Sequence, residues 1–299
     1  MLVTGSDGFV GRWLMSHLAA SGDVAIGLDP AVDVTDAPAL RAAVVGTEPD
    51  AIVHLAAQAS VAQSWEQPLA TFAVNATGTL HLTEAALACP HPPRVLLVGS
   101  AEVYGIVGPE DLPLREDRPL APVSPYALSK ATAEQIGRQA WLGRGLEVVS
   151  ARPFNHSGPG QAPGFVIPSL ARQIVDSDRS GATAISVGDT SVRRDLTDVR
   201  DVVRAYRLLL AAGTPGQVYN VCRGQSTEIA EVGRRLAALA RVDLPFVVDP
   251  DRLRPVDIHD LRGDPAHLHD ATGWRPEIDL DRTLADVLAS LAAPTTPSP

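Results

Sequence analysis

The sequence predicts an α/β fold: a doubly wound parallel sheet followed by a smaller C-terminal subdomain. Short apolar segments alternate with longer helix-like segments through the first half of the chain, a pattern typical of parallel sheets with helices on both faces. After Asn155 the chain changes to a loop rich in glycine and proline, which precedes an apolar helix near 167–175. With 299 residues, of which 45% are apolar, the chain is long enough to bury a sizeable core.

The predicted elements follow from this alternation. Strands are expected at 2–4, 24–29, 51–55, 94–98 and 146–151, and helices at 9–21, 69–89 and 125–142. Only a few residues separate Asp29 from Asp33, too little chain for a crossover helix, so one crossover is expected to be a short loop.

The division into subdomains follows the same pattern. The sheet is expected to use residues 1–155 with about 196–222, and a substrate-binding subdomain 156–195 with 223–292. Residues 293–299 are expected to form a flexible tail, because 294–299 contain only Pro, Thr and Ser and have no apolar pattern.

Composition limits the partners and the compartment. The formal net charge of −10 argues against nucleic acids and anionic membranes as partners. Cys89 and Cys222 are isolated, which favours a reducing cytoplasm over a disulfide framework, and neither they nor the histidines near 267–270 have the spacing of a metal site. The chain opens on an apolar strand without a basic leader and has no stretch long enough to span a bilayer, so we expect a cytoplasmic protein.

The most informative side chain is Lys130, the only lysine among 25 basic residues. It follows Tyr126 by four residues in a predicted helix whose N-cap is Ser124 and whose first residue is Pro125. Residues at this spacing share one helical face, and a nearby cation lowers the pKa of a phenol. Tyr126 is therefore a candidate general acid or base, although an isolated pair of this kind is more often a surface contact.

A glycine-rich turn directly follows the first strand. It reads Gly5-Ser6-Asp7-Gly8-Phe9-Val10-Gly11 and opens a helix, the setting in which a Rossmann-type sheet binds the pyrophosphate of a dinucleotide. Asp29, at the end of the next strand, can accept both ribose hydroxyls of NAD and would repel the extra phosphate of NADP. We therefore expect NAD(H) to be favoured, with NADP(H) possible.

Several blocks together resemble the extended short-chain dehydrogenase/reductase family, whose members modify nucleotide sugars. These blocks are the glycine turn, His54-Leu55-Ala56-Ala57, Gly99–Gly105, the Tyr126/Lys130 helix, Arg193–Val199 and Tyr219-Asn220-Val221. The resemblance implies that Ser100 forms a hydrogen bond to the reacting oxygen and that Tyr126 exchanges a proton with this oxygen. It also implies that Lys130 binds the nicotinamide ribose. It implies a cofactor site formed by Gly5, Gly8, Phe9, Val10, Gly11, Asp29, Asp33, Val34, Leu55, Ala56, Ala57, Asn75, Tyr126, Lys130 and Pro153. It implies substrate contacts from Ser60, Ser100, Asn155, Val166, Arg193 and Arg254.

Within that family, the blocks Phe154–Gln161, Gly164-Phe165-Val166, Leu253-Arg254-Pro255 and Thr272–Pro276 resemble the reductases that form GDP-D-rhamnose from GDP-6-deoxy-4-keto-D-mannose. The related dehydratases usually carry Glu-Ser-Pro where this chain has Ser157-Gly158-Pro159. This resemblance implies a GDP-linked sugar, hydride transfer to its C4 ketone, and Tyr126 as the proton donor.

Three alternatives remain open. Glu102 occupies the place of the glutamate base of sugar 4,6-dehydratases, whereas Ala101 removes an acid that some of them use. A 4-epimerase and a nucleotide sensor without turnover are further possibilities; the complete Ser100, Tyr126 and Lys130 set argues against the sensor.

The resemblance also implies a homodimer through the helices near 69–89 and 125–142.

Overall fold

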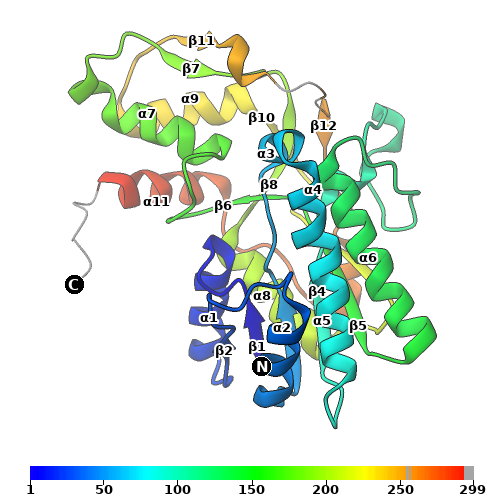
Figure 1. The fold of residues 1–299 in the computed structure, drawn as a ribbon. Helices are drawn as coiled ribbons and strands as arrows, with labels where there is room; N and C mark the ends of the chain where they lie inside the picture. The colour runs from blue at the N-terminus through cyan, green and yellow to red at the C-terminus, as the bar shows by residue number, and fades with distance from the viewer. Residues whose placement is uncertain (254–255, 257, 293–299) are drawn as a thin grey trace, which may run out of the picture.

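The computed structural model describes residues 1–253, 256 and 258–292. The predicted substrate ligand Arg254 and the predicted tail 293–299 lie outside the described residues. The chain forms a large sheet layered between helices and a smaller part beside the carboxyl ends of its strands (Figure 1). Among the described residues, none of the helices is long and apolar enough to cross a bilayer.

All strands of the large sheet run parallel, as the alternation of elements predicts. Their spatial order is β2 (Ile26–Gly27), β1 (Leu2–Thr4), β3 (Ala51–His54), β4 (Arg94–Val98), β5 (Val148–Pro153) and β9 (Val218–Val221). Because the chain leaves β1 for β2 on one side and returns to β3 on the other, the strand order reverses beside β1. Ligands of doubly wound sheets bind at such a reversal, beyond the carboxyl ends of the strands.

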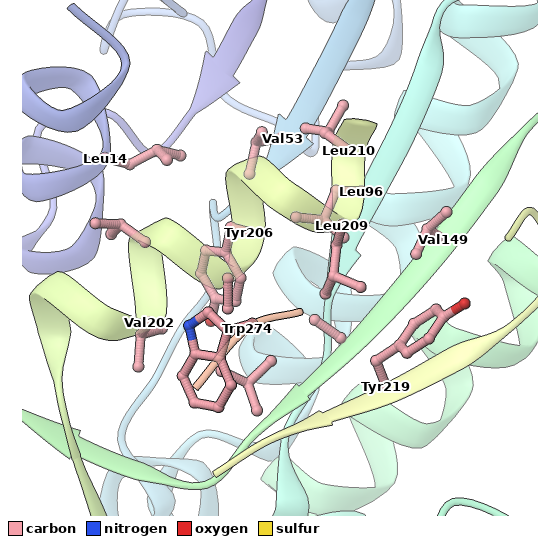
Figure 2. Packing of buried hydrophobic residues seen from close by; sticks show 14 of the residues in the cluster. Leu14, Val53, Leu96, Val149, Val202, Tyr206, Leu209, Leu210, Tyr219 and Trp274 are labelled. Carbon is pink, nitrogen blue, oxygen red and sulfur yellow. The ribbon is translucent and has the colours of Figure 1, made fainter. Parts of the chain in front are cut away.

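Helices cover both faces of this sheet (Figure 1). On one face, α1 (Phe9–Ala20) and α8 (Val199–Ala212) enclose a core that includes Leu14, Tyr206 and Trp274 (Figure 2). On the other face lie α2 (Ala37–Thr47), α5 (Gly78–Leu87) and α6 (Pro125–Arg144). The two apolar layers hold the strand ends, and therefore the loops that follow them, in fixed positions.

Two expectations about β2 and the crossover that follows it need correction. The crossover from β2 to β3 does contain a helix, α2, because the loop after Asp29 is followed by the N-cap Asp36, whose Oδ1 accepts from the Ala39 amide at 3.0 Å. Strand β2 is shorter than 24–29 and lies at the edge of the sheet, where Ile26 is exposed.

The predicted helix 69–89 is divided rather than continuous. It consists of α4 (Pro68–Phe72), a π-helical turn (Ala73–Thr77) and α5, and it follows the short helix α3 (Val61–Glu66). Turns of π-helix are often found at functional sites, and Asn75 lies in this one.

The smaller part contains short sheets and a group of helices. The strands are β6 (Asn155–Ser157), β7 (Ile185–Val187), β8 (Arg193–Asp198), β10 (Ser226–Glu228), β11 (Phe246–Val248) and β12 (Asp260–Leu261). The helices α7 (Val166–Ser180), α9 (Ile229–Ala240) and α11 (Leu280–Ala292) share one apolar cluster. The helix α10 (Ala266–Thr272) instead places Leu268 in the core beneath α8, so this late segment packs against the large sheet. The division into two subdomains stays a prediction.

Candidate active site

The turn after β1 has the geometry of a backbone cradle. Gly5 has φ +68°, a conformation that L side chains rarely adopt, and a Cβ there would lie 2.8 Å from the Ala56 amide nitrogen. A Cβ on Gly11 would collide with the Gly5 and Ser6 carbonyl oxygens, so α1 can approach the turn this closely only because Gly11 lacks a side chain. Phe9 and Val10 begin α1, with Gly8 as its N-cap. The turn thus presents free helix N-terminal amides to a phosphate group.

Asp29, Asp33 and Val34 lie in the segment that follows β2. Because β1 and β2 are parallel, this segment lies at the same end of the sheet as the glycine turn. The Asp29 carboxylate is exposed and accepts from the Ala31 amide at 2.9 Å. Asp33 accepts from the amide and the hydroxyl of Thr35, both at 2.8 Å, and these hydrogen bonds hold its pKa below the usual value. Val34 is buried against Gly78 of α5. An exposed carboxylate beside a buried apolar wall suits a ribose and its base.

Leu55, Ala56 and Ala57 follow β3 and lie next to the glycine turn. The Leu55 amide donates to the main-chain oxygen of Thr4 at 3.2 Å, and the Ala56 amide donates to Thr4 Oγ1 at 3.1 Å. These bonds fix the half-buried segment 55–57 beside the cradle.

Asn75 anchors the loop that continues from this segment. Its Oδ1 accepts from the Gln58 amide at 2.8 Å, and its Nδ2 donates to Gln58 O at 3.0 Å and to Ser129 Oγ at 2.9 Å. The side-chain amide is thus directed at the protein, and Asn75 joins the loop after β3 to α6, the helix that carries Tyr126.

Tyr126 and Ser100 lie next to each other, as the family resemblance implies. Ser124 caps α6 by accepting from the Ala127 amide at 3.1 Å, and Pro125 is the first helical residue. The buried Tyr126 hydroxyl is hydrogen-bonded to Ser100, which follows β4. Ser100 Oγ also accepts from the Glu102 amide at 3.2 Å, which places half-buried Glu102 close enough for its charge to act on the phenol.

The predicted lowering of the Tyr126 pKa is wrong in this structure. Burial raises the pKa of Tyr126 to about 12, the hydrogen bond from Ser100 opposes the rise, and the charge of Glu102 adds to it. Lys130 shares the helical face, but its Nζ donates to the main-chain oxygen of Val98 at 2.8 Å. The spacing therefore predicts the common face correctly and the electrostatic effect incorrectly. Burial lowers the pKa of Lys130 itself to about 8.

The predicted substrate residues lie on several segments. Half-buried Asn155 begins β6, and its buried Oδ1 has no hydrogen-bond partner among the described residues. Ser60 caps α3 by accepting from the Gln63 amide, and Val166 is exposed at the start of α7. Arg193 donates to the Ser226 carbonyl at 2.9 Å and lies 3.9 Å from Asp260, so its guanidinium is held by β10 and β12. Pro153 ends β5, beside Val221.

One cluster was missed by the sequence analysis. Glu134 on α6 and Arg152 on β5 form a buried ion pair that also contacts Tyr104. The available signal was the position of Glu134, four residues after Lys130 on the same helical face.

A cavity of about 750 Å³ is lined by charged residues of both signs that include Arg115, Glu116, Glu134, Arg152 and Asp270, so the ion pair forms part of its wall. None of the predicted site residues lines it, so its size alone does not make it the substrate site. Among the described residues, no group of three or more His, Cys, Asp or Glu side chains is placed to hold a metal ion.

A parallel sheet with a glycine cradle at the reversal of strand order, and a Ser-Tyr-Lys set beside it, defines an oxidoreductase of the extended short-chain dehydrogenase/reductase class. Residues 30–287 match the family model described as GDP-mannose 4,6 dehydratase, and the chain belongs to this family.

The chain is similar to the GDP-6-deoxy-D-mannose reductase of Pseudomonas aeruginosa, with 40% identity over 97% of this chain and 96% of that protein. It is similar in structure to RMD from Pseudomonas aeruginosa in complex with NADPH, with 40% identity, a TM-score of 0.90, and coverage of 97% of this chain and 98% of that one. The UDP-glucose 4-epimerase of Thermus thermophilus, in complex with NAD, is 28% identical, with a TM-score of 0.88 over 98% of this chain and 99% of that one.

Proposed function

We propose that this protein reduces the C4 ketone of GDP-6-deoxy-4-keto-D-mannose to give GDP-D-rhamnose. The observation that carries the proposal is the 40% identity to a GDP-6-deoxy-D-mannose reductase over nearly the full length of both chains. A complete set of Ser100, Tyr126 and Lys130 at the carboxyl ends of the strands supports turnover rather than sensing.

The residues present fit a nicotinamide dinucleotide. Gly5 and Gly11 of the glycine turn leave no room for a Cβ, and the exposed Asp29 carboxylate lies past the end of β2. Gly5, Gly8 and Gly11 would hold the pyrophosphate, Asp29 the ribose hydroxyls, and Lys130 the second ribose. The reduced cofactor, when bound, supplies the hydride that adds to C4.

Tyr126 donates a proton, and Ser100 a hydrogen bond, to the oxygen of the ketone. As the carbonyl carbon gains hydride, its oxygen becomes an alkoxide, which takes the phenolic proton of Tyr126. Ser100, already hydrogen-bonded to that phenol, is placed to donate to the same oxygen. A pKa of about 12 keeps Tyr126 protonated at neutral pH, as a proton donor requires.

For the cofactor, we infer a preference for NADH. The exposed Asp29 carboxylate would repel a 2′-phosphate, and this repulsion supports NADH, whereas the similar RMD structure holds NADPH. Asp33 supports the same preference less strongly, because its carboxylate is already hydrogen-bonded to Thr35.

A second candidate function is dehydration of GDP-mannose. It is favoured by Glu102, whose charge acts on the Tyr126 hydroxyl and which could remove a proton from the sugar ring. In that reaction the hydride returns to the sugar, so no reduced cofactor is consumed.

We further infer a homodimer formed through α3, α4, α5 and α6. These helices lie side by side (Figure 1), and they expose Trp65, Leu69, Phe72, Leu80 and Leu128. A second copy of the same helices would cover this apolar surface. Light scattering of the native protein and of Leu69→Glu tests this, since only the native protein is expected at twice the chain mass.

Cys89 and Cys222 are both free and buried, which supports a cytoplasmic location.

The test of the main proposal is a reaction with freshly generated GDP-6-deoxy-4-keto-D-mannose and NADH or NADPH. Loss of nicotinamide absorbance in step with formation of GDP-D-rhamnose, identified by NMR, is the expected result. If no reduced cofactor is consumed, incubation with GDP-mannose decides whether the dehydratase candidate replaces it.

A further inference from the structure

Tyr126, Lys130 and Glu134 follow one another at intervals of four residues along α6, so they lie on one helical face. The buried Glu134 accepts two hydrogen bonds from Arg152 of β5: Nε to Oε2 at 2.8 Å and Nη2 to Oε1 at 2.7 Å. A two-bond pairing of this kind fixes the orientation of both groups as well as their distance. The pair therefore sets how the helix with Tyr126 lies against β5.

The same pair lies beside the peptide that precedes Ser100. The Gly99 amide donates to Ala151 O at 2.7 Å, and a Cβ at Gly99 would be 3.9 Å from both Glu134 Oε2 and Arg152 Cγ. Lys130 donates to Val98 O just before it. The backbone from 98 to 100 is thus held by Lys130 of the helix that carries the phenol and by the main chain of β5, next to the Glu134–Arg152 pair.

Arg152 also reaches the segment that follows Ser100. Its Nη1 donates to the Tyr104 hydroxyl at 2.8 Å, and its guanidinium carbon lies 4.8 Å from the centroid of the Tyr104 ring. Tyr104 is fully buried and donates in turn to Asn220 Oδ1 at 2.7 Å. Glu102 stands between Ser100 and Tyr104 in the same short 3₁₀ turn (Ala101–Tyr104). Arg152 therefore contacts the structure on both sides of Ser100.

We propose that Glu134 and Arg152 are positioning residues that keep Ser100 within hydrogen-bond distance of Tyr126. The proposal rests on the proposed reduction, in which these two hydroxyls act on one oxygen. A buried ion pair gives little net stability over apolar residues of similar size, so a role in orientation accounts for charges at this place. The pair acts through the phenol and the serine and does not itself touch the substrate.

The test compares three variants with the native protein. Glu134→Gln removes the charge, and the double variant Glu134→Leu/Arg152→Met removes both charges without leaving one unpaired. Arg144→Met is the matched control, because Arg144 ends the same helix in an exposed ion pair with Glu84 at 3.0 Å. We expect kcat of the first two to fall about 10- to 100-fold, the effect of a small misplacement of reacting groups, with KM for sugar and cofactor changed less than about threefold. The control should keep the native kcat.

A second readout does not depend on the substrate. Protein labelled with ¹³C at tyrosine Cζ gives signals from four tyrosines, and Tyr126→Phe identifies that of Tyr126. Loss of the Ser100 contact should move this signal in both ion-pair variants and leave it in place in Arg144→Met. If the native protein consumes no reduced cofactor, the proposed reduction is wrong, and the Tyr126 signal still decides the positioning role. A folded double variant with native kcat, or with an unmoved Tyr126 signal, overturns the inference.

Discussion

Lys130 Nζ donates a hydrogen bond to the main-chain oxygen of Val98 at 2.8 Å. The bond joins the second turn of α6 to the last residue of β4, the strand that leads into Ser100. Lys130 is 7% exposed, and burial lowers its pKa to about 8. The single lysine of the chain thus helps to fix the two segments that carry Ser100 and Tyr126, and it does so at a cost in desolvation.

Replacement of Tyr126 by Phe should remove the proton donor and leave the binding sites intact. We expect kcat to fall about 10²- to 10⁴-fold, the usual contribution of a positioned general acid. Steady-state rates with the keto sugar, with nicotinamide fluorescence as the measure of cofactor binding, check this. Unchanged turnover in a variant that still binds cofactor would remove Tyr126 from the mechanism.

Replacement of Lys130 by Met should change the pH dependence of stability. The lysine pKa is 10.5 when unperturbed and about 8 in the folded state, so between these values the unfolded chain binds more protons and native stability rises with pH. Methionine has no such dependence. The stability of the variant relative to the native protein should therefore decrease from about pH 8 to about pH 10.5, by on the order of 3 kcal/mol.

Urea unfolding at several pH values measures this difference. Below about pH 8 both states of the native protein are protonated, so the difference should be constant there. Tyr126 does not obscure the effect, because its own contribution, which arises between pH 10.0 and about 12, is common to the native protein and the variant and cancels in the difference. A difference that stays constant up to about pH 10.5 would show that the Lys130 pKa is not lowered.

The sequence predicted what depends on local pattern. Strand β4 falls on the residues where it was expected, and α6 begins at Pro125 with Ser124 as its cap, because apolar runs and capping residues act within a few positions. Ser100 and Tyr126 were brought together only by the family resemblance, since they come from different elements.

What the sequence could not predict depends on tertiary burial. The direction of the Tyr126 pKa is set by desolvation and by Ser100 and Glu102, none of which a Tyr-x-x-x-Lys spacing contains. The partner of Glu134 lies on β5, eighteen residues further along the chain, so helical periodicity showed the face of Glu134 but not the ion pair. The helix α2 begins beyond the short interval that follows Asp29, after the cap Asp36, so the length of that interval did not predict it.

Replacement of Asp29 by Ala should relax the choice between cofactors. An exposed carboxylate repels a nearby phosphate by about 1 kcal/mol, so the ratio of kcat/KM for NADH to that for NADPH should fall roughly fivefold. The matched control is Asp36→Ala, which removes the same charge from the same loop. The control loses a helix cap, and should lower stability by about 1 kcal/mol without changing the ratio. Equal ratios in Asp29→Ala and the native protein would contradict the role of Asp29.

Replacement of Tyr206 by Phe should leave stability unchanged or raise it by about 1 kcal/mol. Tyr206 lies in the core beneath the sheet (Figure 2), and its buried hydroxyl has no hydrogen-bond partner among the described residues. Removing an unsatisfied buried polar atom relieves its desolvation cost. Thermal unfolding of the variant checks this, and a clear loss of stability would show that the hydroxyl has a partner.

Asn155 combines a cost in stability with an expected role in binding. Its Oδ1 is buried without a partner among the described residues, at the start of β6 next to the segment that leads to α7. A buried acceptor without a partner destabilises a protein by about 1 to 3 kcal/mol, and a donor on the sugar nucleotide would relieve this. Asn155→Ala should therefore be as stable as the native protein or more so, while KM for the keto sugar rises about tenfold and the Kd of the reduced cofactor stays the same. Melting curves and steady-state kinetics separate the two effects. A variant that is less stable but has native KM would mean that Asn155 supports the fold and does not contact the sugar.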